Sequence, residues 1–349
     1  MKVLQEKFDE INGQPVTSTT LINDEGMEVT SIDYGCIITK VIVPDKNGQR
    51  ENVVLGFDFV KEYEKHSPYF GAVVGRFAGR IKDGNFELEG RTYQLERNNN
   101  GHHLHGGGKG FDKVIWNSEI KSGENETSVV YTYLSSDGEE GYPGNLEMKV
   151  TYTLSNSNEF TIFYEAVSDK KTLLNVTNHS YFNLSGDLKW DILEHELTLK
   201  SESFLELDKE LIPTGDILSV KGTPFDFKEG RCIKDGVNSA HVQNILAGNG
   251  YDHPFLLSEN HNQEIVLKDD ESGRMLTIET DQPAVVLYTG TQMASDFDIR
   301  GVKSRKYLGL CLETQGLPDS IHHPHFPSNI LDKDEVFRSA TKYIFNVIT

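Results

Sequence analysis

LEMKVTYTLSNSNEFTIFYEAV, residues 146–167, consists of two runs in which apolar and polar side chains alternate, separated by the polar segment SNSN. An alternation of period two places the apolar side chains on one face of a β-strand. Two such runs joined by a few turn-forming residues predict neighbouring antiparallel strands. This stretch therefore favours a β-sheet with one face packed against a core.

Similar runs recur along the whole chain and are bounded by Gly, Asn, Asp or Pro. They include CIITKVIVP, NFELEGRTYQL, TSVVYTYL, HELTLKSESFLEL, RMLTIETDQPAVVLYTG and KYLGLCLET. A helical pattern is limited to DFVKEYEKH at residues 58–66, so strands and helices do not alternate as they do in a doubly wound fold. The sequence predicts an all-β fold, a large antiparallel β-sandwich with few short helices.

The chain has 349 residues, of which 37% are hydrophobic, and no low-complexity or proline-rich linker divides it. Large all-β folds often exceed the usual domain length, so we expect a single domain over residues 1–349. The cysteines Cys36, Cys232 and Cys311 are odd in number and far apart, which does not suit a disulfide framework. We expect them to be buried as small hydrophobic residues.

The charge balance narrows the choice of partners. The chain carries 54 acidic and 34 basic side chains, a formal charge of −20, which repels nucleic acids and anionic lipid surfaces. The N-terminal segment MKVLQEKFDEINGQPV lacks the apolar core of a signal peptide, and no stretch approaches the roughly 20 apolar residues that span a bilayer. We expect a cytoplasmic protein with a neutral small-molecule ligand, as a monomer or homodimer.

Two strand-like stretches present titratable groups. In LLNVTNHSYFNLSG, residues 173–186, strand alternation places His179 on the face opposite Leu174 and Val176, among polar side chains that could line a cleft. In KYLGLCLETQGLPDS, Glu313 lies opposite a stripe of leucines. A partly desolvated carboxylate has a raised pKa and makes a useful base near neutral pH. The alternatives are a histidine that is at the surface or merely hydrogen-bonded, and an exposed acid at a strand end.

The segment RNNNGHHLHGGGKGFDKVIW, residues 97–116, combines glycines with His102, His103 and His105. Its glycines allow the backbone to approach a ligand closely, but the spacing of a phosphate-binding loop is absent. A second histidine group, SIHHPHFP, keeps a metal site open as an alternative, for example a cupin-like site using His103 and His105.

Three turn-rich segments supply further polar groups. VVGRFAGRIKDGNF contributes Arg76 and Arg80, GNGYDHPF contributes Asp252, and SSDGEEGYPGNL precedes a strand. Arginine and aspartate can hold the vicinal hydroxyls of a sugar through charge-assisted hydrogen bonds. Taken alone, each of these residues is more typical of an ordinary loop position than of a ligand contact.

Together, GRFAGRI, LHGGGKGFDKVIW, GEEGYPGNL, TNHSYFNL, GYDHPF and LETQGLPDS resemble, in order, the aldose 1-epimerases, also called galactose mutarotases. The resemblance covers nearly the whole chain. It implies a β-sandwich with a sugar cleft that interconverts the α and β anomers of free aldohexoses such as galactose and glucose, without metal or organic cofactor. By this resemblance Glu313 is the general base and His179 the general acid. His105, Arg80 and Asp252 bind and orient the sugar.

The sequence departs from the family pattern at two positions. Gly79 precedes Arg80 where the family commonly has asparagine, and Val286 stands where some members have glutamine. Both changes leave the preferred sugar open. Two other functions also remain open: an epimerase for a phosphorylated hexose, in which Arg76 or Lys109 would help hold the phosphate, and a non-catalytic sugar-binding module. The presence of both an acid and a base argues against the module.

Overall fold

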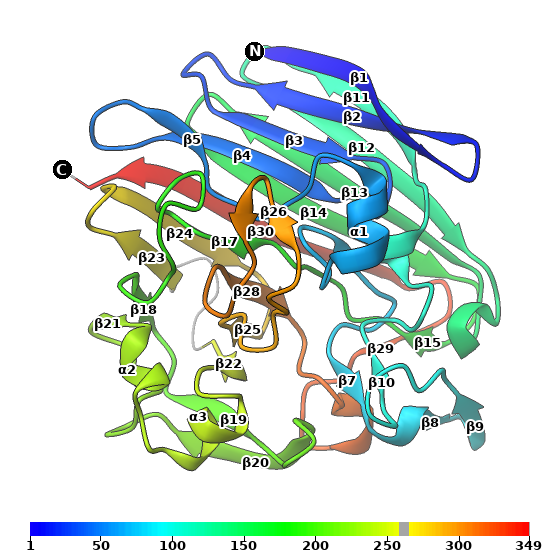
Figure 1. The fold of residues 1–349 in the computed structure, drawn as a ribbon. Helices are drawn as coiled ribbons and strands as arrows, with labels where there is room; N and C mark the ends of the chain where they lie inside the picture. Colours follow the sequence, from blue (N-terminus) through cyan, green and yellow to red (C-terminus); the bar gives the residue numbers. More distant parts are fainter. Residues whose placement is uncertain (258–264, 349) are drawn as a thin grey trace.

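A computed structural model describes residues 1–257 and 265–348. Three sheets dominate it, and all strand pairings within them are antiparallel. The five-stranded sheet has the order β1 (Lys2–Ile11), β2 (Gln14–Ile22), β3 (Glu28–Ile32), β4 (Ile38–Pro44) and β5 (Arg50–Asn52). In Figure 1 this blue sheet lies across the strands of a larger, mostly green sheet.

The larger sheet has nine strands and contains the stretch that opened the analysis. Its order is β11 (Asn117–Ser122), β12 (Glu126–Ser135), β13 (Leu146–Ser155), β14 (Glu159–Ser168), β30 (Val336–Val347), β24 (Arg274–Thr280), β23 (Ile265–Asp269), β18 (Glu196–Leu199) and β21 (Arg231–Cys232). β13 and β14 form a hairpin in register from Leu146 and Ser168 to Leu154 and Phe160. Burial alternates along both strands, which confirms the predicted period of two.

The third sheet has six strands and carries much of the candidate site. Its order is β17 (Tyr181–Phe182), β28 (Leu310–Gln315), β25 (Ala284–Tyr288), β22 (Asp252–Leu256), β19 (Ser203–Leu207) and β20 (Pro213–Ser219). β28 lies between β17 and β25, and all six of its residues are buried.

Five two-stranded pairs and a few short helices complete the described residues. The pairs are β7 (Arg80–Ile81) with β10 (His103–Leu104), β6 (Val73–Val74) with β16 (Thr177–Asn178), β8 (Asn85–Leu88) with β9 (Arg91–Gln94), β15 (Thr172–Leu173) with β29 (Ile330–Leu331), and β26 (Asp298–Ile299) with β27 (Val302–Lys303). The α-helices are α1 (Val60–His66), α2 (Lys234–Val237) and α3 (Val242–Leu246), and the 3₁₀ turns are η1 (Lys82–Gly84), η2 (Phe111–Lys113), η3 (Glu139–Gly141) and η4 (Ser320–His322). None of the helices in the described part of the chain is long and apolar enough to cross a membrane.

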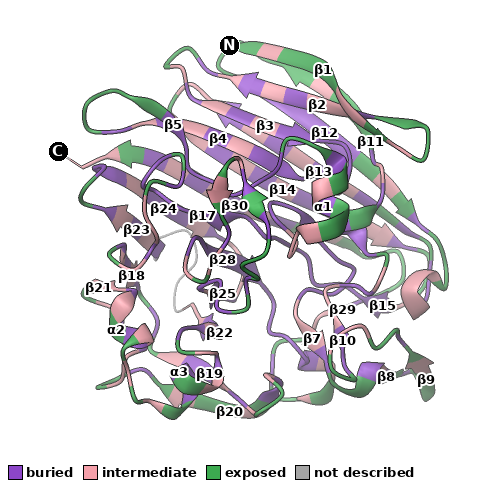
Figure 2. Ribbon diagram, in the orientation of Figure 1, coloured by how far each residue is buried: buried purple, intermediate pink, exposed green. Residues whose placement is uncertain are grey.

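The main hydrophobic core fills the space between the nine-stranded sheet and the other two sheets. Val150 and Ile162 of the nine-stranded sheet share one buried cluster with Ile38 of β4 and Leu312 of β28. Figure 2 shows buried residues along the inner strands, whereas β1 at the edge is largely exposed. The prediction of an all-β, antiparallel sandwich with few short helices is confirmed.

The cysteines follow the expectation only in part. Cys36 and Cys311 are fully buried, but Cys232 is half-buried, so the expectation for Cys232 was wrong. Cys232 lies on β21, which pairs only with β18 and forms an edge of the nine-stranded sheet. A residue on an edge strand has a neighbouring strand on one side only.

Candidate active site

A cavity of about 290 Å³ is lined by the five residues to which the family resemblance assigned roles: Arg80, His105, His179, Asp252 and Glu313. They come from β7, from the loop after β10, from the segment between β16 and β17, and from β22 and β28. Residues far apart in the sequence therefore meet at one cavity.

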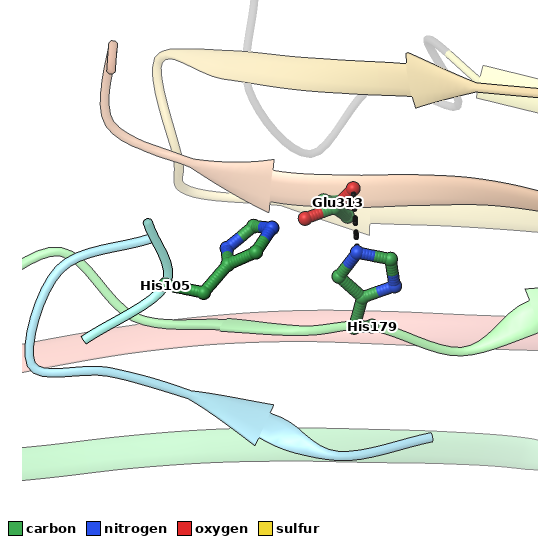
Figure 3. Close-up of side chains that lie close together, drawn as sticks. All are labelled: His105, His179 and Glu313. Carbon is green, nitrogen blue, oxygen red and sulfur yellow. Dashed lines mark ion pairs between the residues drawn. The ribbon is translucent and has the colours of Figure 1, made fainter. Parts of the chain in front are cut away.

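Glu313 and His179 face each other in this cavity. Oε1 of Glu313 lies 3.5 Å from Nε2 of His179, and the two side chains are only 4% and 5% exposed. Figure 3 shows the pair, with Glu313 on β28 and the imidazole of His179 pointing up toward it from the segment below. The alternatives of an exposed strand-end acid and a surface histidine are wrong for these positions.

The backbone fixes both groups. Glu313 lies in the interior of a buried sheet, paired with Val286 of β25. His179 occupies the break between β16 and β17, where its N–H donates to Ala72 O at 2.9 Å and its carbonyl accepts from Gly71 N at 3.0 Å. The segment is thus two short strands and not the single strand that its alternation suggested, but His179 still faces the cavity.

Burial changes the acid–base chemistry of the pair. It raises the pKa of Glu313 well above the usual range, and the nearby Asp252 adds to the increase while Arg80 opposes it. Burial lowers the pKa of His179 to about 4, because the charged imidazolium loses its hydration. A nearby carboxylate can raise the pKa of an imidazole, but at His179 the effect of burial dominates. Between the two pKa values the pair holds one proton.

His105 lies beside the pair in a defined tautomer. The N–H of Gly79 donates to Nδ1 of His105 at 3.2 Å, and burial lowers the His105 pKa well below its usual value. A neutral imidazole whose Nδ1 accepts a hydrogen bond carries its proton on Nε2. Nε2 of His105, which lines the cavity, is therefore a hydrogen-bond donor.

This tautomer bears directly on metal binding. The possible ligand atoms of His105, His179 and Glu313 lie within 4.8 Å of one another, the only such group among residues 1–257 and 265–348. Nε2 of His105 carries the proton, and a protonated imidazole nitrogen cannot bind a metal. Moving this proton to Nδ1 would point it at the N–H of Gly79, which is also a donor. The donor set therefore fits a metal ion poorly.

The metal site suggested by the two histidine groups does not form as expected. His103 is turned away from the cavity, with Nδ1 at 2.8 Å from Glu96 O and Nε2 at 2.7 Å from the Tyr142 hydroxyl. His323 and His325 hydrogen-bond to the carbonyls of β20 through Nε2. The pairing of His103 with His105 was wrong because adjacent residues of this loop do not continue one strand.

Arg80 and Asp252 form the polar wall of the cavity. Nη1 of Arg80 lies 3.7 Å from Oδ2 of Asp252, and Nε of Arg80 donates to Asn99 Oδ1 at 3.2 Å. Burial raises the pKa of Asp252 to about 6, although Arg80 opposes the shift. This arrangement leaves a carboxylate and a guanidinium beside each other, as the recognition of neighbouring hydroxyls requires.

Arg76 and Lys109 do not belong to the cavity. The guanidinium of Arg76 is buried and donates to the carbonyls of Ser135, Pro143 and Gly144, among others. Lys109 is exposed on a loop whose N–H groups are held by the Glu140 carboxylate. The suggestion that either could hold a phosphate was wrong, because Arg76 has a structural role and Lys109 lies outside the lining.

Three cavity residues were missed or not assigned a role from the sequence. Tyr69 lies against both histidine rings, with centroids 4.7 Å from His105 and 5.6 Å from His179, and its φ of +68° is rare for a tyrosine. Nothing in the sequence pattern indicates this conformation. Tyr181 stacks on His179 at 5.1 Å. Gln315 is two residues after Glu313 on the same strand face, so alternation does locate it.

The two departures from the family pattern both line the cavity. Gly79 has φ +81°, and a Cβ placed there would lie 2.7 Å from Cβ of Pro318. Val286 is the cross-strand neighbour of Glu313. These positions place no polar side chain in the cavity, so its polar contacts come from other residues.

Comparisons with known proteins show the family of the chain. Residues 17–344 match the aldose 1-epimerase family. The chain is 40% identical to galactose mutarotase of Sus scrofa, covering 93% of each chain, and 39% identical to aldose 1-epimerase of Haemophilus influenzae, covering 92% and 93%. The crystal structure of galactose 1-epimerase from Lactobacillus acidophilus NCFM superposes with a TM-score of 0.90 at 30% identity, covering 100% of this chain and 99% of that one. The chain belongs to the aldose 1-epimerase family.

Proposed function

We propose that this protein interconverts the α and β anomers of a free aldohexose, with Glu313 as the general base and His179 as the general acid. The main evidence for this proposal is the 3.5 Å separation of the two groups within one cavity. The reacting oxygens O1 and O5 are bonded to the same carbon of the sugar. A base and an acid that serve both must therefore lie within a few ångströms of each other.

The reaction needs only proton transfers from these residues. Glu313 takes the proton of the O1 hydroxyl while His179 delivers a proton to O5, so that the C1–O5 bond opens to the aldehyde. Rotation about C1–C2 presents the other carbonyl face, and reclosure returns the protons. Each positioned proton transfer contributes roughly 10²- to 10⁴-fold in rate. In this scheme the Nε2 proton of His105 binds a sugar oxygen, and Arg80 and Asp252 orient the ring hydroxyls.

The active form of the pair carries one proton, as Glu313 carboxylate and His179 imidazolium. Burial favours the isomer with the same net charge, in which the carboxyl is protonated and the imidazole neutral. The two isomers differ by a proton transfer across the 3.5 Å gap. Because their net charge is equal, pH does not change their ratio, and a minor active fraction persists over the whole range in which the pair holds one proton.

The lining supports a neutral sugar over a phosphorylated one. Among the described residues that line the cavity, Arg80 is the one arginine and there is no lysine, and Arg80 already faces Asp252. A phosphate dianion would meet Asp252 and Glu313 with a single guanidinium to offset them. We propose that residues 1–349 act as one catalytic unit, because the lining extends from Pro68 to Pro318.

The direct test is anomer exchange followed by polarimetry or NMR, starting from fresh α-galactose and α-glucose, with glucose 6-phosphate in parallel. We expect the free sugars to be turned over and the phosphorylated sugar to be a poor substrate. No catalysed exchange with any free aldohexose would overturn the proposal. Preferred exchange of the 6-phosphate would replace it with the phosphohexose alternative.

Removal of metal ions is expected to leave activity unchanged. The acid and the base are both side chains of this protein, and the His105 tautomer disfavours metal ligation. The test compares kcat/KM before and after dialysis against EDTA, with added zinc or magnesium as a further arm. A loss of activity that a metal ion restores would contradict the expectation.

The pH dependence should assign the two pKa values to their residues. We expect kcat/KM to fall on the acid side near pH 4, where His179 is protonated and the pair then holds two protons. On the alkaline side it should fall at the raised pKa of Glu313, where the pair loses its proton. NMR titration of the His179 ring in the free enzyme should follow the acid limb. Titration of that ring with the alkaline limb would contradict the assignment.

A further inference from the structure

Gln315 is a polar side chain of the cavity to which the proposed reaction gives no role. It is fully buried, lines the cavity, and lies two residues beyond Glu313 on β28. Side chains two residues apart on a strand point to the same face, so Gln315 faces the site from the same side as the base.

The side chain of Gln315 is held in a defined orientation. Its Nε2 donates to Gly316 O at 3.2 Å. The Gly316 N–H in turn donates to Asn175 Oδ1 at 2.8 Å, and Asn175 Nδ2 donates to the carbonyls of Ala78 and Gly316 at 3.1 Å each. This network identifies the nitrogen of the Gln315 amide as the donor and thereby places its oxygen.

That oxygen accepts no hydrogen bond from any protein atom in the described part of the chain. A buried amide oxygen is nearly always hydrogen-bonded, and leaving one unpaired is costly. The adjacent Gly79 cannot supply a donor, because it has no side chain and its N–H is used by His105 Nδ1. Because Gln315 lines the cavity, a ligand bound there can supply the missing donor.

We propose that Oε1 of Gln315 accepts a hydrogen bond from a ring hydroxyl of the sugar other than O1, so that Gln315 is a substrate-binding residue of this enzyme. The proposal rests on the proposed sugar substrate. A sugar hydroxyl is a suitable donor, and every free aldohexose presents several. Two residues along a strand span about 6.6 Å, so Gln315 reaches a part of the ring away from the group that Glu313 serves.

This contact discriminates between sugars. A site built to accept a hydrogen bond from one hydroxyl disfavours the analogue that lacks it, because the buried oxygen is then left unpaired. Gly79 and Val286 offer no polar side chain, and Gln315 is one of several polar side chains of the lining, beside Arg80 and Asp252, that can contact the ring hydroxyls. It therefore acts as a determinant of sugar preference.

The test replaces Gln315 with methionine, which keeps the length and approximate volume of the side chain but has no strong acceptor. Gly316 O retains a donor in this variant, because Asn175 also bonds to it. We expect Q315M to raise KM for the preferred sugar about ten-fold, the effect of one lost hydrogen bond, with kcat within about two-fold of wild type. Q94M, at an exposed glutamine of β9 outside the cavity, is the matched control and should behave as wild type.

The decisive part of the experiment uses deoxy sugars. Wild type and Q315M are compared on the 2-, 3-, 4- and 6-deoxy analogues by anomer exchange. We expect one analogue to lose about ten-fold in kcat/KM with wild type and to lose nothing further with Q315M, which identifies the hydroxyl that Gln315 binds. Equal kcat/KM of wild type and Q315M on the parent sugar would overturn the inference, as would additive losses with every analogue.

The outcomes separate this inference from the function on which it rests. If wild type exchanges no aldose, the proposed function has failed before Gln315 is tested. If wild type is active and Q315M shows no coupling with any hydroxyl, only the role of Gln315 has failed. Thermal unfolding of Q315M is measured alongside, and if Q315M is unfolded, Q315L takes its place in the same comparison.

Discussion

Replacing Glu313 with glutamine is expected to reduce kcat for anomer exchange by about 10³-fold, which is the range for loss of a positioned general base. The amide is nearly isosteric with the carboxylate but is a very poor proton acceptor. Sugar affinity should change by less than about three-fold, because the contacts of His105, Arg80 and Asp252 are retained. Polarimetry gives the turnover, and isothermal titration with the sugar gives the affinity.

The same substitution should not destabilise the fold at neutral or alkaline pH. Burial raises the folded-state pKa of Glu313, so the stability that this group contributes is present below its ordinary pKa and is lost as pH rises through the raised value. A glutamine is neutral at every pH and escapes that loss. The unfolding temperature of E313Q relative to wild type should therefore increase as the pH rises from the ordinary pKa of a glutamate through the raised pKa of Glu313, a pattern expected of a residue kept for activity and not for stability.

The matched control is E279Q. Glu279 lies on β24, outside the cavity, and its carboxylate pairs with Lys342 at 3.7 Å. Loss of this partly exposed ion pair should cost less than about 1 kcal/mol and leave turnover unchanged. A folded E313Q variant that keeps more than about a tenth of wild-type turnover would remove Glu313 from the role of base.

The fold was largely predictable because the alternation of apolar and polar residues in the sequence matches the alternation of buried and more exposed positions in the sheet. In β13 and β14 every second residue is buried, and the register that follows from the short turn between them is the one observed. The assembly of three sheets around one core was not predictable residue by residue. It depends on pairings such as β14 with β30, whose residues are far apart in the sequence.

The candidate site was predictable to a different extent at each residue. Alternation put Glu313 and Gln315 on one face of a strand, and the structure agrees. Nothing local separated Arg80, which lines the cavity, from Arg76 four residues earlier, which binds backbone carbonyls. Only the course of the distant segment around residues 135–144 distinguishes them.

The acid–base properties of the pair were the least predictable part. A histidine beside a carboxylate is expected to have a raised pKa, but burial dominates and lowers that of His179 to about 4. Tyr69, in a bend after α1, and Tyr181, on β17, lie against the ring and come from segments far apart in the sequence. The φ of +68° that places Tyr69 there has no signature in the sequence.

Replacing His179 with asparagine is expected to lower kcat by about 10²- to 10³-fold, since no proton is then delivered to O5. The variant also loses the ring contacts with Tyr69 and Tyr181, which should cost about 1 kcal/mol of stability. H66N is the matched control, because His66 stacks on Phe297 outside the cavity, so it should lose comparable stability but no turnover. Near wild-type polarimetric turnover of a folded H179N variant would remove His179 from the role of acid.

The double variant E313Q/H179N tests whether the two residues act as a unit. If each carried out an independent step, the two losses would multiply to about 10⁵-fold or more. In the proposed reaction one proton leaves O1 as another reaches O5, so removing either group already stops the exchange that the pair performs. The double variant should therefore lose little beyond the larger single loss, as groups of one catalytic unit do. A loss of turnover in the double variant equal to the product of the two single losses would show instead that Glu313 and His179, although 3.5 Å apart, act in separate steps.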